Sequence, residues 1–209
     1  PPMPMPAFTW KRRMAVAAGA ARGLSHLHDH EKMVHGNLTS TNILLDEHLV
    51  PKLSDFGLSR LMTQSANSAV LASAGALGYR APELTKMKKA TPKSDVYSFG
   101  IVLLELLTGK TSASTRKQHG KASSSSSSSP MDLPDWVASL VKKNEWSHEI
   151  FDAELVRSVD DGIRPRDEDL IACLQLAMAC VKISPRERPD MAEVVRRLEE
   201  LGPGEEEQG

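Results

Sequence analysis

The spacing of apolar residues predicts a long helix near the start of the chain. From residue 10 onward, apolar and small side chains recur every three or four positions, as a helix with one buried face requires. These positions are Met14, Ala17, Ala18, Ala21 and Leu24. Thr9 is a suitable N-cap for a helix that begins at Trp10, and the pattern is lost near residues 27–29.

Other periodic segments predict further helices. Residues 94–108 are apolar at nearly every position, which is typical of a buried helix, and Gly109 is expected to end it. Three segments with a single apolar stripe predict amphipathic helices at residues 133–141, 167–181 and 191–201. Trp136, in the first of them, is interpreted as a packing anchor. Asp190 and Glu193 fit a capping box at the start of the last.

One short ribbon interrupts this helical pattern. Two apolar runs, at residues 43–45 and around Leu53, flank a polar turn at residues 46–48, which predicts two paired strands. The expected fold class is therefore α+β, mainly α-helical with a short β-ribbon. A chain of 209 residues is long enough for one domain with a sizeable core, expected at residues 9–202.

Three segments lie outside that expected core. Residues 1–8 are Pro-rich and are interpreted as a linker remnant, and residues 203–209 as an acidic tail. Residues 111–130 contain a run of serines with too few apolar side chains to order itself, which predicts a flexible insertion.

Three motifs follow one another around and after the ribbon. They are His35-Gly36-Asn37-Leu38 with Asn42, then Asp55-Phe56-Gly57, then Ala81-Pro82-Glu83. The order and spacing resemble the protein kinase pattern of His-Arg-Asp-Leu with a later Asn, Asp-Phe-Gly and Ala-Pro-Glu. The chain therefore resembles the large lobe (C-lobe) of a protein kinase. The Gly-rich loop and strand lysine of the small lobe do not occur in it.

The first motif departs from the family pattern at positions that carry chemistry. Asn37 stands where the family has the Asp that accepts the substrate hydroxyl proton, and Thr39 replaces a common Lys. Gly36 replaces the Arg, and Ala76 replaces a Thr ahead of the third motif. A carboxamide is not basic near neutral pH, whereas a positioned base typically supplies ~10²–10⁴-fold in rate. The resemblance therefore implies a degenerate catalytic site.

Other positions match the family pattern. Asn42 and Asp55 match the residues that hold Mg²⁺ and ATP in the family. Structural positions are matched by His35, Phe56, Gly57, Glu83, Asp95 and Arg188. By resemblance, Asp95 braces the catalytic-loop backbone and Arg188 pairs with Glu83. The segment between Asp55 and Glu83 resembles the activation segment, in which Ser65, Ser68 and Ser73 are possible phosphorylation sites.

Composition narrows the classes of partner. A net charge of −1 argues against nucleic acid as the main partner, and no apolar run reaches the roughly 18–20 residues of a membrane span.

The cysteines and histidines are not expected to form a disulfide or a metal site. Cys173 and Cys180 lie seven residues apart in a predicted helix, a Cα separation of about 10 Å that exceeds the reach of a disulfide. Both are expected to be buried thiols in a reducing compartment. The histidines at 26, 28, 30 and 35 have no second cluster that would complete a metal site.

Within the kinases, the chain most resembles plant leucine-rich-repeat receptor-like kinases. Residues 34–42, with Gly75-Ala-Leu-Gly-Tyr-Arg-Ala-Pro-Glu83 and Leu106-Leu-Thr-Gly-Lys110, resemble the inactive meristem receptor-like kinase group. That resemblance implies a soluble piece of a single-pass receptor, on the cytoplasmic side of the plasma membrane.

Three functions remain open from the sequence. The first is an inactive kinase lobe that signals through protein partners, such as kinases, receptors or its own small lobe. The second is a fragment of an active Ser/Thr kinase that transfers the γ-phosphate of ATP to protein. The third is a truncated interaction module without a signalling role. No cofactor is expected in this chain by itself, although the family uses Mg²⁺ and ATP.

Overall fold

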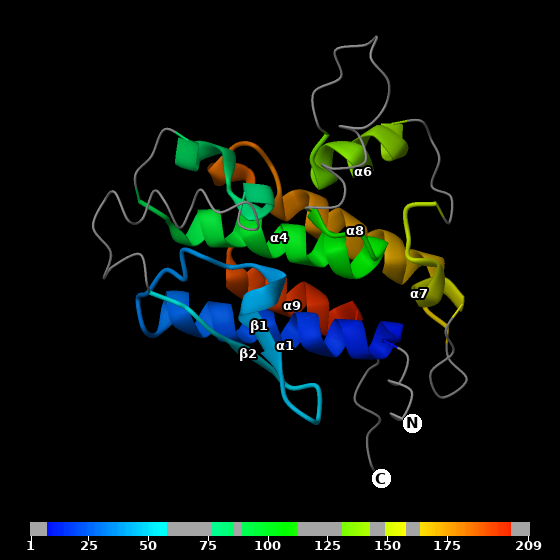
Figure 1. Cartoon of the computed structure of the whole chain (residues 1–209), viewed down its shortest axis with the longest axis horizontal. Coiled ribbons are helices and arrows are strands. Elements are labelled where there is room, and N and C mark those ends of the chain that lie inside the picture. The colour runs from blue at the N-terminus through cyan, green and yellow to red at the C-terminus, as the bar shows by residue number, and fades with distance from the viewer. Residues whose placement is uncertain are drawn as a thin grey trace.

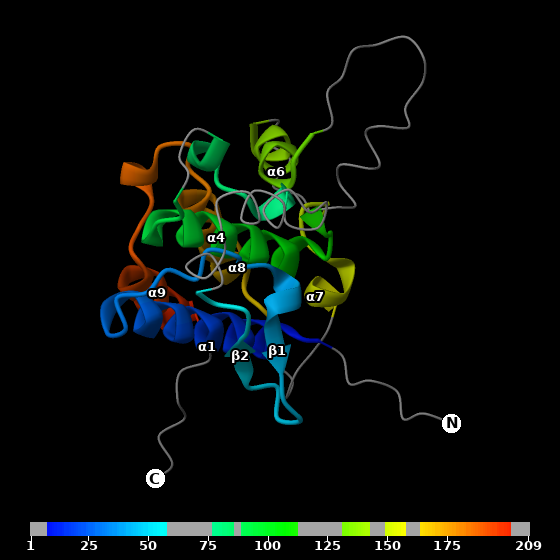
Figure 2. The ribbon, with the colours of Figure 1, turned by 60° about the vertical axis from the view of Figure 1, so that its left-hand side comes forward.

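The helix α4, Pro92–Thr108, runs through the centre of the fold with other helices on either side of it (Figure 1). The computed structural model describes residues 8–57, 77–85, 89–112, 131–142, 149–157 and 164–201. Helix α8, Asp167–Cys180, packs along α4, and α1, Trp10–Asp29, packs along α9, Met191–Leu201. Figure 2 shows the same pairing of α1 with α9 from another side. Two shorter helices, α6 (Leu133–Lys142) and α7 (Ala153–Arg157), lie toward the periphery.

Helix α4 begins and ends on local signals. At its start, the Thr91 side chain accepts from the amide of Ser94, and the Ser94 side chain accepts from the amide of Thr91. This reciprocal cap and the Pro92 at the first turn start the helix two residues before the predicted Ser94, a signal that the apolar pattern does not contain. Gly109 ends the helix in the left-handed conformation, as predicted.

The start of α1 is held differently from the prediction. Thr9 occupies the N-cap position, but its side chain makes no capping bond, so that part of the prediction is wrong. Arg13, which is buried, donates to the carbonyl of Phe8 at 2.6 Å and pairs with Asp152 at 2.5 Å. Phe8, the last residue of the predicted linker, thereby contacts the first turns of α1. Residues 1–7 of the predicted linker lie outside the described part of the chain.

The core between these helices contains both cysteines. Cys173 and Cys180 are free and fully buried on α8, as predicted, and burial raises the pKa of each thiol to about 12. The Cys173 Sγ lies 3.8 Å from the Sδ of Met14 on α1. The two thiols are therefore packing groups and stay protonated near neutral pH.

The predicted ribbon is present. Strand β1, Ile43–Leu45, pairs antiparallel with β2, Pro51–Leu53, with Ile43 opposite Leu53. The Asp46 carboxylate closes the turn by accepting from the amides of His48 and Val50, both at 2.9 Å. The α+β prediction, mainly helical with one short ribbon, is confirmed.

Two predicted details near the ends of helices need correction. Ser112 was placed in the flexible insertion, yet it is buried and its amide donates to Glu105 at 2.7 Å, because the segment after α4 folds back onto it. In the predicted capping box of α9, Asp190 accepts from the amide of Glu193, while the Glu193 carboxylate bonds Arg196. Residues 113–130 and 202–209 lie outside the described residues. No helix among those described is both long and apolar enough to cross a membrane.

Candidate functional site

The loop at residues 35–42 connects α1 to the ribbon and is fixed to α4 by one carboxylate. Asp95, buried in the first turn of α4, accepts from the amide of His35 at 2.7 Å and from the amide of Gly36 at 2.9 Å. The Nε2 of His28, at the end of α1, lies 2.9 Å from the same carboxylate. Three partners satisfy a charge that would otherwise be costly to bury, and they join loop, α1 and α4 at one point.

The ring of His35 lies under the second motif. It is fully buried, and its centroid is 6.4 Å from that of Phe56, edge to face. Burial is the largest influence on the His35 pKa and lowers it, although Asp95 and Asp55 act in the opposite direction. The ring is therefore neutral near pH 7. The amide of Gly57 donates to the His35 carbonyl at 3.3 Å, which brings the two motifs together.

Asn37 and Asn42 occupy the two ends of the loop and are joined to each other. The Asn42 side-chain amide donates to the carbonyl of Asn37 at 2.8 Å, and the Asn42 carbonyl accepts from the amide of Ser54 at 2.9 Å. The Asn37 carboxamide makes no hydrogen bond to another described residue. Thr39 is buried and its hydroxyl contacts that of Thr41. These groups can form hydrogen bonds but cannot accept a proton near neutral pH.

Two side chains are suited to a hard cation. The bond from Asn42 to Asn37 uses the amide nitrogen, which leaves the Asn42 oxygen available, and Asp55 is an exposed carboxylate with φ of 59°. Oxygen ligands of this kind fit Mg²⁺, which also depends on phosphate oxygens. Within the described ranges, no cluster of three His, Cys, Asp or Glu side chains could hold a metal ion.

A buried ion pair supports the third motif. Arg188, ahead of α9, donates to both oxygens of Glu83 at 2.7 and 2.8 Å and to three backbone carbonyls. Its guanidinium also lies 5.0 Å from the centre of the Tyr97 ring. Burial is the largest single influence on the Glu83 pKa and opposes ionisation, but the hydrogen bonds and charge of Arg188 and a backbone hydrogen bond together lower the pKa. The pair ties residues 105 positions apart.

Some groups at the site were not predicted. Tyr79 donates to the carboxylate of Glu105 on α4 and contacts the hydroxyl of Ser40 at 2.8 Å. Burial raises the Tyr79 pKa to about 12, and it also raises the pKa of Glu105. A single acidic residue inside the apolar run of α4 was a signal that Glu105 has a polar partner. His28 gave no comparable signal, because its partner Asp95 lies 67 residues away.

The structure does not place the predicted phosphorylation sites or the residue that replaces the family Thr ahead of the third motif. Ser65, Ser68, Ser73 and Ala76 fall outside the described residues.

Next to the loop, three large apolar side chains are exposed. Leu44, Leu45 and Phe56 expose 54, 42 and 46% of their surface. Leu44 and Leu45 are consecutive in β1 and point to opposite sides of the ribbon, so these exposed side chains do not form one apolar face.

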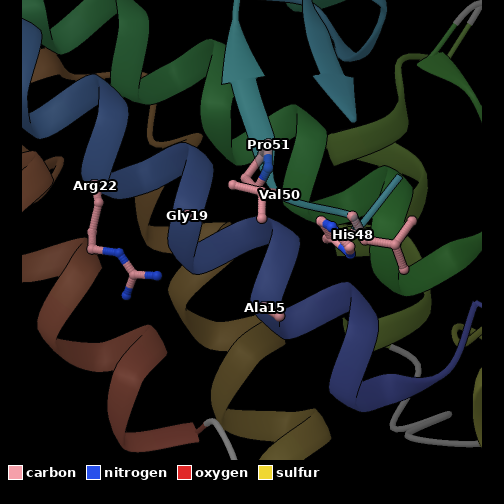
Figure 3. Close-up of a pocket in the computed structure, with 7 residues that line it drawn as sticks. Ala15, Gly19, Arg22, His48, Val50 and Pro51 are labelled. Carbon is pink, nitrogen blue, oxygen red and sulfur yellow. The ribbon is translucent and has the colours of Figure 1, made fainter. Parts of the chain in front are cut away.

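A hollow of about 340 Å³ lies between α1 and the turn of the ribbon (Figure 3). Ala15, Gly19 and Arg22 line it from α1, and Val50 and Pro51 line it from the ribbon. Arg22 is already paired with Glu199 at 2.9 Å. The hollow is wide, open and separate from the loop, so we do not regard it as the functional site.

The known proteins that are similar to this chain include plant receptor kinases. The most similar include "Probable leucine-rich repeat receptor-like protein kinase IMK3" of Arabidopsis thaliana, 48% identical over 95% of this chain and 23% of the relative. A "Probable inactive receptor kinase" of the same plant is 42% identical over 94% of this chain and 28% of its own. The chain thus spans about a quarter of the length of these relatives.

Solved structures agree. The kinase domain of maize SIRK1 (sucrose-induced receptor kinase 1), bound to AMP-PNP, has a TM-score of 0.76 and 32% identity, over 94% of this chain and 61% of that one. The pseudokinase domain of BIR2, an immune regulator of the RLK/Pelle family, has a TM-score of 0.70 and 31% identity, over 93% of this chain and 53% of its own. The family model for protein tyrosine and serine/threonine kinases matches residues 4–198. The chain belongs to the protein kinase family, among relatives that are plant leucine-rich-repeat receptor-like kinases.

Proposed function

We propose that this chain is the large lobe of a receptor-like pseudokinase, which does not transfer phosphate and acts in signalling through protein–protein contacts. One observation carries the proposal. The hydrogen bonds that hold the loop at residues 35–42 are present, yet the side chain at the position of the catalytic base is the carboxamide of Asn37. A side chain that cannot take a proton removes general-base catalysis while leaving the loop conformation intact.

The preserved contacts support a retained scaffold with altered chemistry. Asp95 holds the loop backbone, and Arg188 holds Glu83 under the third motif. Both contacts stabilise the fold without depending on catalysis. Several relatives are named inactive receptor kinases, and one structural neighbour is a pseudokinase domain, which agrees with this assignment.

Nucleotide and metal would meet only part of their usual site here. Asn42 and Asp55 would supply oxygen ligands to Mg²⁺, whose chemistry is to neutralise charge on the phosphates of ATP. The chain contains neither the Gly-rich loop nor the strand lysine that hold those phosphates in the family. We therefore expect weak nucleotide binding at most.

The partners follow from the exposed surface and from the relatives. The exposed apolar side chains of Leu44, Leu45 and Phe56 are those that we expect a small lobe or another partner to contact in a longer protein. Other kinases or receptors are the expected signalling partners. The corresponding location is the cytoplasmic side of the plasma membrane, as part of a single-pass receptor.

An active kinase is the second candidate, because one relative at 48% identity is named a receptor-like protein kinase without the word inactive. A phosphoryl-transfer assay separates the two. The chain, joined to a small lobe of its own family, is incubated with radiolabelled ATP, Mg²⁺ and a generic protein substrate. We expect no incorporation above the matched Asp55→Ala variant. Incorporation that Asp55→Ala abolishes would overturn the proposal in favour of the active kinase.

A further inference from the structure

Helix α9 ends beside the hollow between α1 and the turn of the ribbon. Glu199, two residues before the end of α9, accepts from Nη1 of Arg22 at 2.9 Å, and Arg22 lines the hollow. The two helices run in opposite directions (Figure 1), so α9 ends at Leu201 pointing toward the first half of α1. The chain that follows Leu201 therefore begins close to this hollow.

The hollow has small and apolar groups at its centre and a basic residue at each end. Figure 3 shows Arg22 at one end and His48 at the other, with Gly19 and Val50 between them. A Cβ at Gly19 would lie 2.5 Å from Cγ of Pro51, so this glycine allows the turn to approach α1 closely. Val50 is 50% exposed. The walls are thus fixed by packing, while the centre stays uncovered.

Arg22 has donors available for an anion. Its side chain is 57% exposed, and within the described residues its hydrogen bond to Glu199 uses Nη1 alone. Nε and Nη2 are open to a second carboxylate, which a planar guanidinium binds through two parallel donors. Lys11, also exposed, lies about three helical turns before Arg22 on the same face of α1. At the other end, Glu47 lies 3.6 Å from His48, so each end already has one carboxylate beside it.

The acidic end of this chain fits the hollow in charge and in reach. Residues 205–207 are three consecutive glutamates, separated from α9 by Gly202-Pro203-Gly204, a sequence that does not extend a helix and favours a turn. The four residues that follow α9 span at most about 14 Å. Ala15 and Arg22 lie about 10 Å apart along α1. The glutamates can therefore reach the hollow from the end of α9.

We propose that residues 205–207 dock in the hollow, where their carboxylates bond the free donors of Arg22 and the segment covers the surface between α1 and the ribbon turn. Attachment to α9 holds these carboxylates at an effective concentration on the order of millimolar, so exposed ion pairs of ordinary strength suffice. A second copy of the chain offers the same carboxylates only at its free concentration, which favours the attached segment. Docking does not depend on whether the lobe transfers phosphate, so it goes beyond the proposed function.

A spin label near the end of the 209-residue chain tests this by nuclear magnetic resonance. Gln208→Cys supplies a reactive thiol, whereas Cys173 and Cys180 are buried and each has a thiol pKa of about 12. The label should broaden the amide signals of Ala15 and Val50, which line the hollow on its two sides.

The charge of the segment separates docking from attachment alone. In the labelled chain, the triple variant Glu205→Gln, Glu206→Gln, Glu207→Gln should lower the docking equilibrium constant about tenfold, the combined effect of three exposed ion pairs of ordinary strength. The broadening at Ala15 and Val50 should fall accordingly. A segment that is attached but does not dock would broaden these signals equally in both chains.

Variants of the folded part make the test specific. Arg22→Gln should also reduce the broadening, whereas Glu199→Gln should increase it, because that change removes the carboxylate competing for the same guanidinium. Arg196→Gln is the matched control: it changes the charge equally at an exposed arginine of α9 and should leave the broadening unchanged. If Arg22→Gln fails to fold, as judged by circular dichroism, the triple variant decides, since it alters no described residue.

Three outcomes would overturn the docking. The first is equal broadening in the parent chain and the triple variant. The second is a loss in Arg196→Gln as large as that in Arg22→Gln, which would show a general effect of charge. The third concerns a mixture of isotope-labelled chains with separate spin-labelled chains. Broadening at Ala15 and Val50 in that mixture would assign the hollow to the segment of a second copy.

Discussion

The amide of Gly36 donates a 2.9 Å hydrogen bond to Oδ1 of Asp95 while Gly36 itself has a φ of 76°. The bond fixes the loop to α4, and it requires a backbone conformation that side chains with a Cβ adopt only at a cost. The glycine at this position therefore does more than remove an arginine. It relieves strain at the point where the loop is held.

A substitution series at Gly36 measures that strain. We expect Gly36→Ala to lower the free energy of unfolding by about 1 kcal/mol, the usual cost of a left-handed residue with a Cβ. Gly36→Asn should cost less, since asparagine tolerates this conformation. Urea denaturation gives both values. Equal costs for Ala and Asn would show that the left-handed backbone of Gly36 does not set the effect.

The ion pair of Glu83 with Arg188 should be a major contributor to stability. The Arg188 side chain is fully buried and that of Glu83 is 12% exposed, so Glu83→Ala leaves an uncompensated buried charge and should cost about 3 kcal/mol or more. Thermal or urea denaturation checks this value. A cost below that of a typical exposed pair would mean that the backbone carbonyls around Arg188 are sufficient partners.

The same pair should make the fold sensitive to acid. The Glu83 pKa is lowered in the folded state, so its contribution is present above the pKa of an unfolded glutamate and is lost as the pH falls through the folded value. Glu83→Gln should flatten this part of the stability profile, measured by urea denaturation between pH 6 and pH 3. Glu193, whose pKa is lowered by the exposed Arg196, is the control. The contribution of Glu193 to the pH dependence of stability should disappear in 1 M salt, whereas the contribution of Glu83 should persist.

The sequence predicted those parts of the fold that depend on local pattern. The apolar period located α1, α8 and α9, and the short apolar runs with a polar turn located the ribbon. The predicted helix starts were wrong where hydrogen bonds of a few polar side chains determine them. Thr91 and Ser94 start α4 earlier than its apolar pattern, and Thr9 holds an N-cap position without capping.

For the candidate site, the sequence predicted only the residues that belong to recognisable motifs. Matching to the kinase pattern singled out Asn37 and Asp95, but the bond from the Gly36 amide to Asp95 forms only once segments 59 residues apart meet. The burial of Ser112 was missed for the same reason: composition assigned it to a polar insertion.

Nucleotide should stabilise this chain little. At millimolar ATP and Mg²⁺ we expect a rise in melting temperature of at most about 1–2 °C, the value for a ligand near its Kd on a protein of this size. The reason is that Asn42 and Asp55 offer two ligands without the phosphate-binding parts of a small lobe. Differential scanning fluorimetry measures the shift, with Asp55→Ala as the control. A rise of several degrees that Asp55→Ala removes would contradict this expectation.

The last prediction concerns restoration of catalysis in a longer protein that joins this lobe to a small lobe of its family. Asn37→Asp returns the base, yet we expect it to restore little activity, because the departures at positions 36, 39 and 76 affect the same step. A cation at Thr39 would stabilise charge that develops on the transferred phosphate, and groups that act as a unit are not additive. The variant Gly36→Arg, Asn37→Asp, Thr39→Lys, Ala76→Thr should therefore exceed the single variant by at least about tenfold in rate.

The structure adds a condition to that experiment. Arginine at position 36 must adopt the φ of 76° to keep its bond to Asp95, so the fourfold variant should also lose about 1 kcal/mol of stability, as Gly36→Ala does. Rates are therefore compared at a temperature where circular dichroism shows both variants folded. A triple variant that retains Gly36 separates strain from chemistry. Equal rates for the single and fourfold variants under these conditions would show that Asn37 alone accounts for the proposed loss of activity, and the idea of a distributed loss would fail.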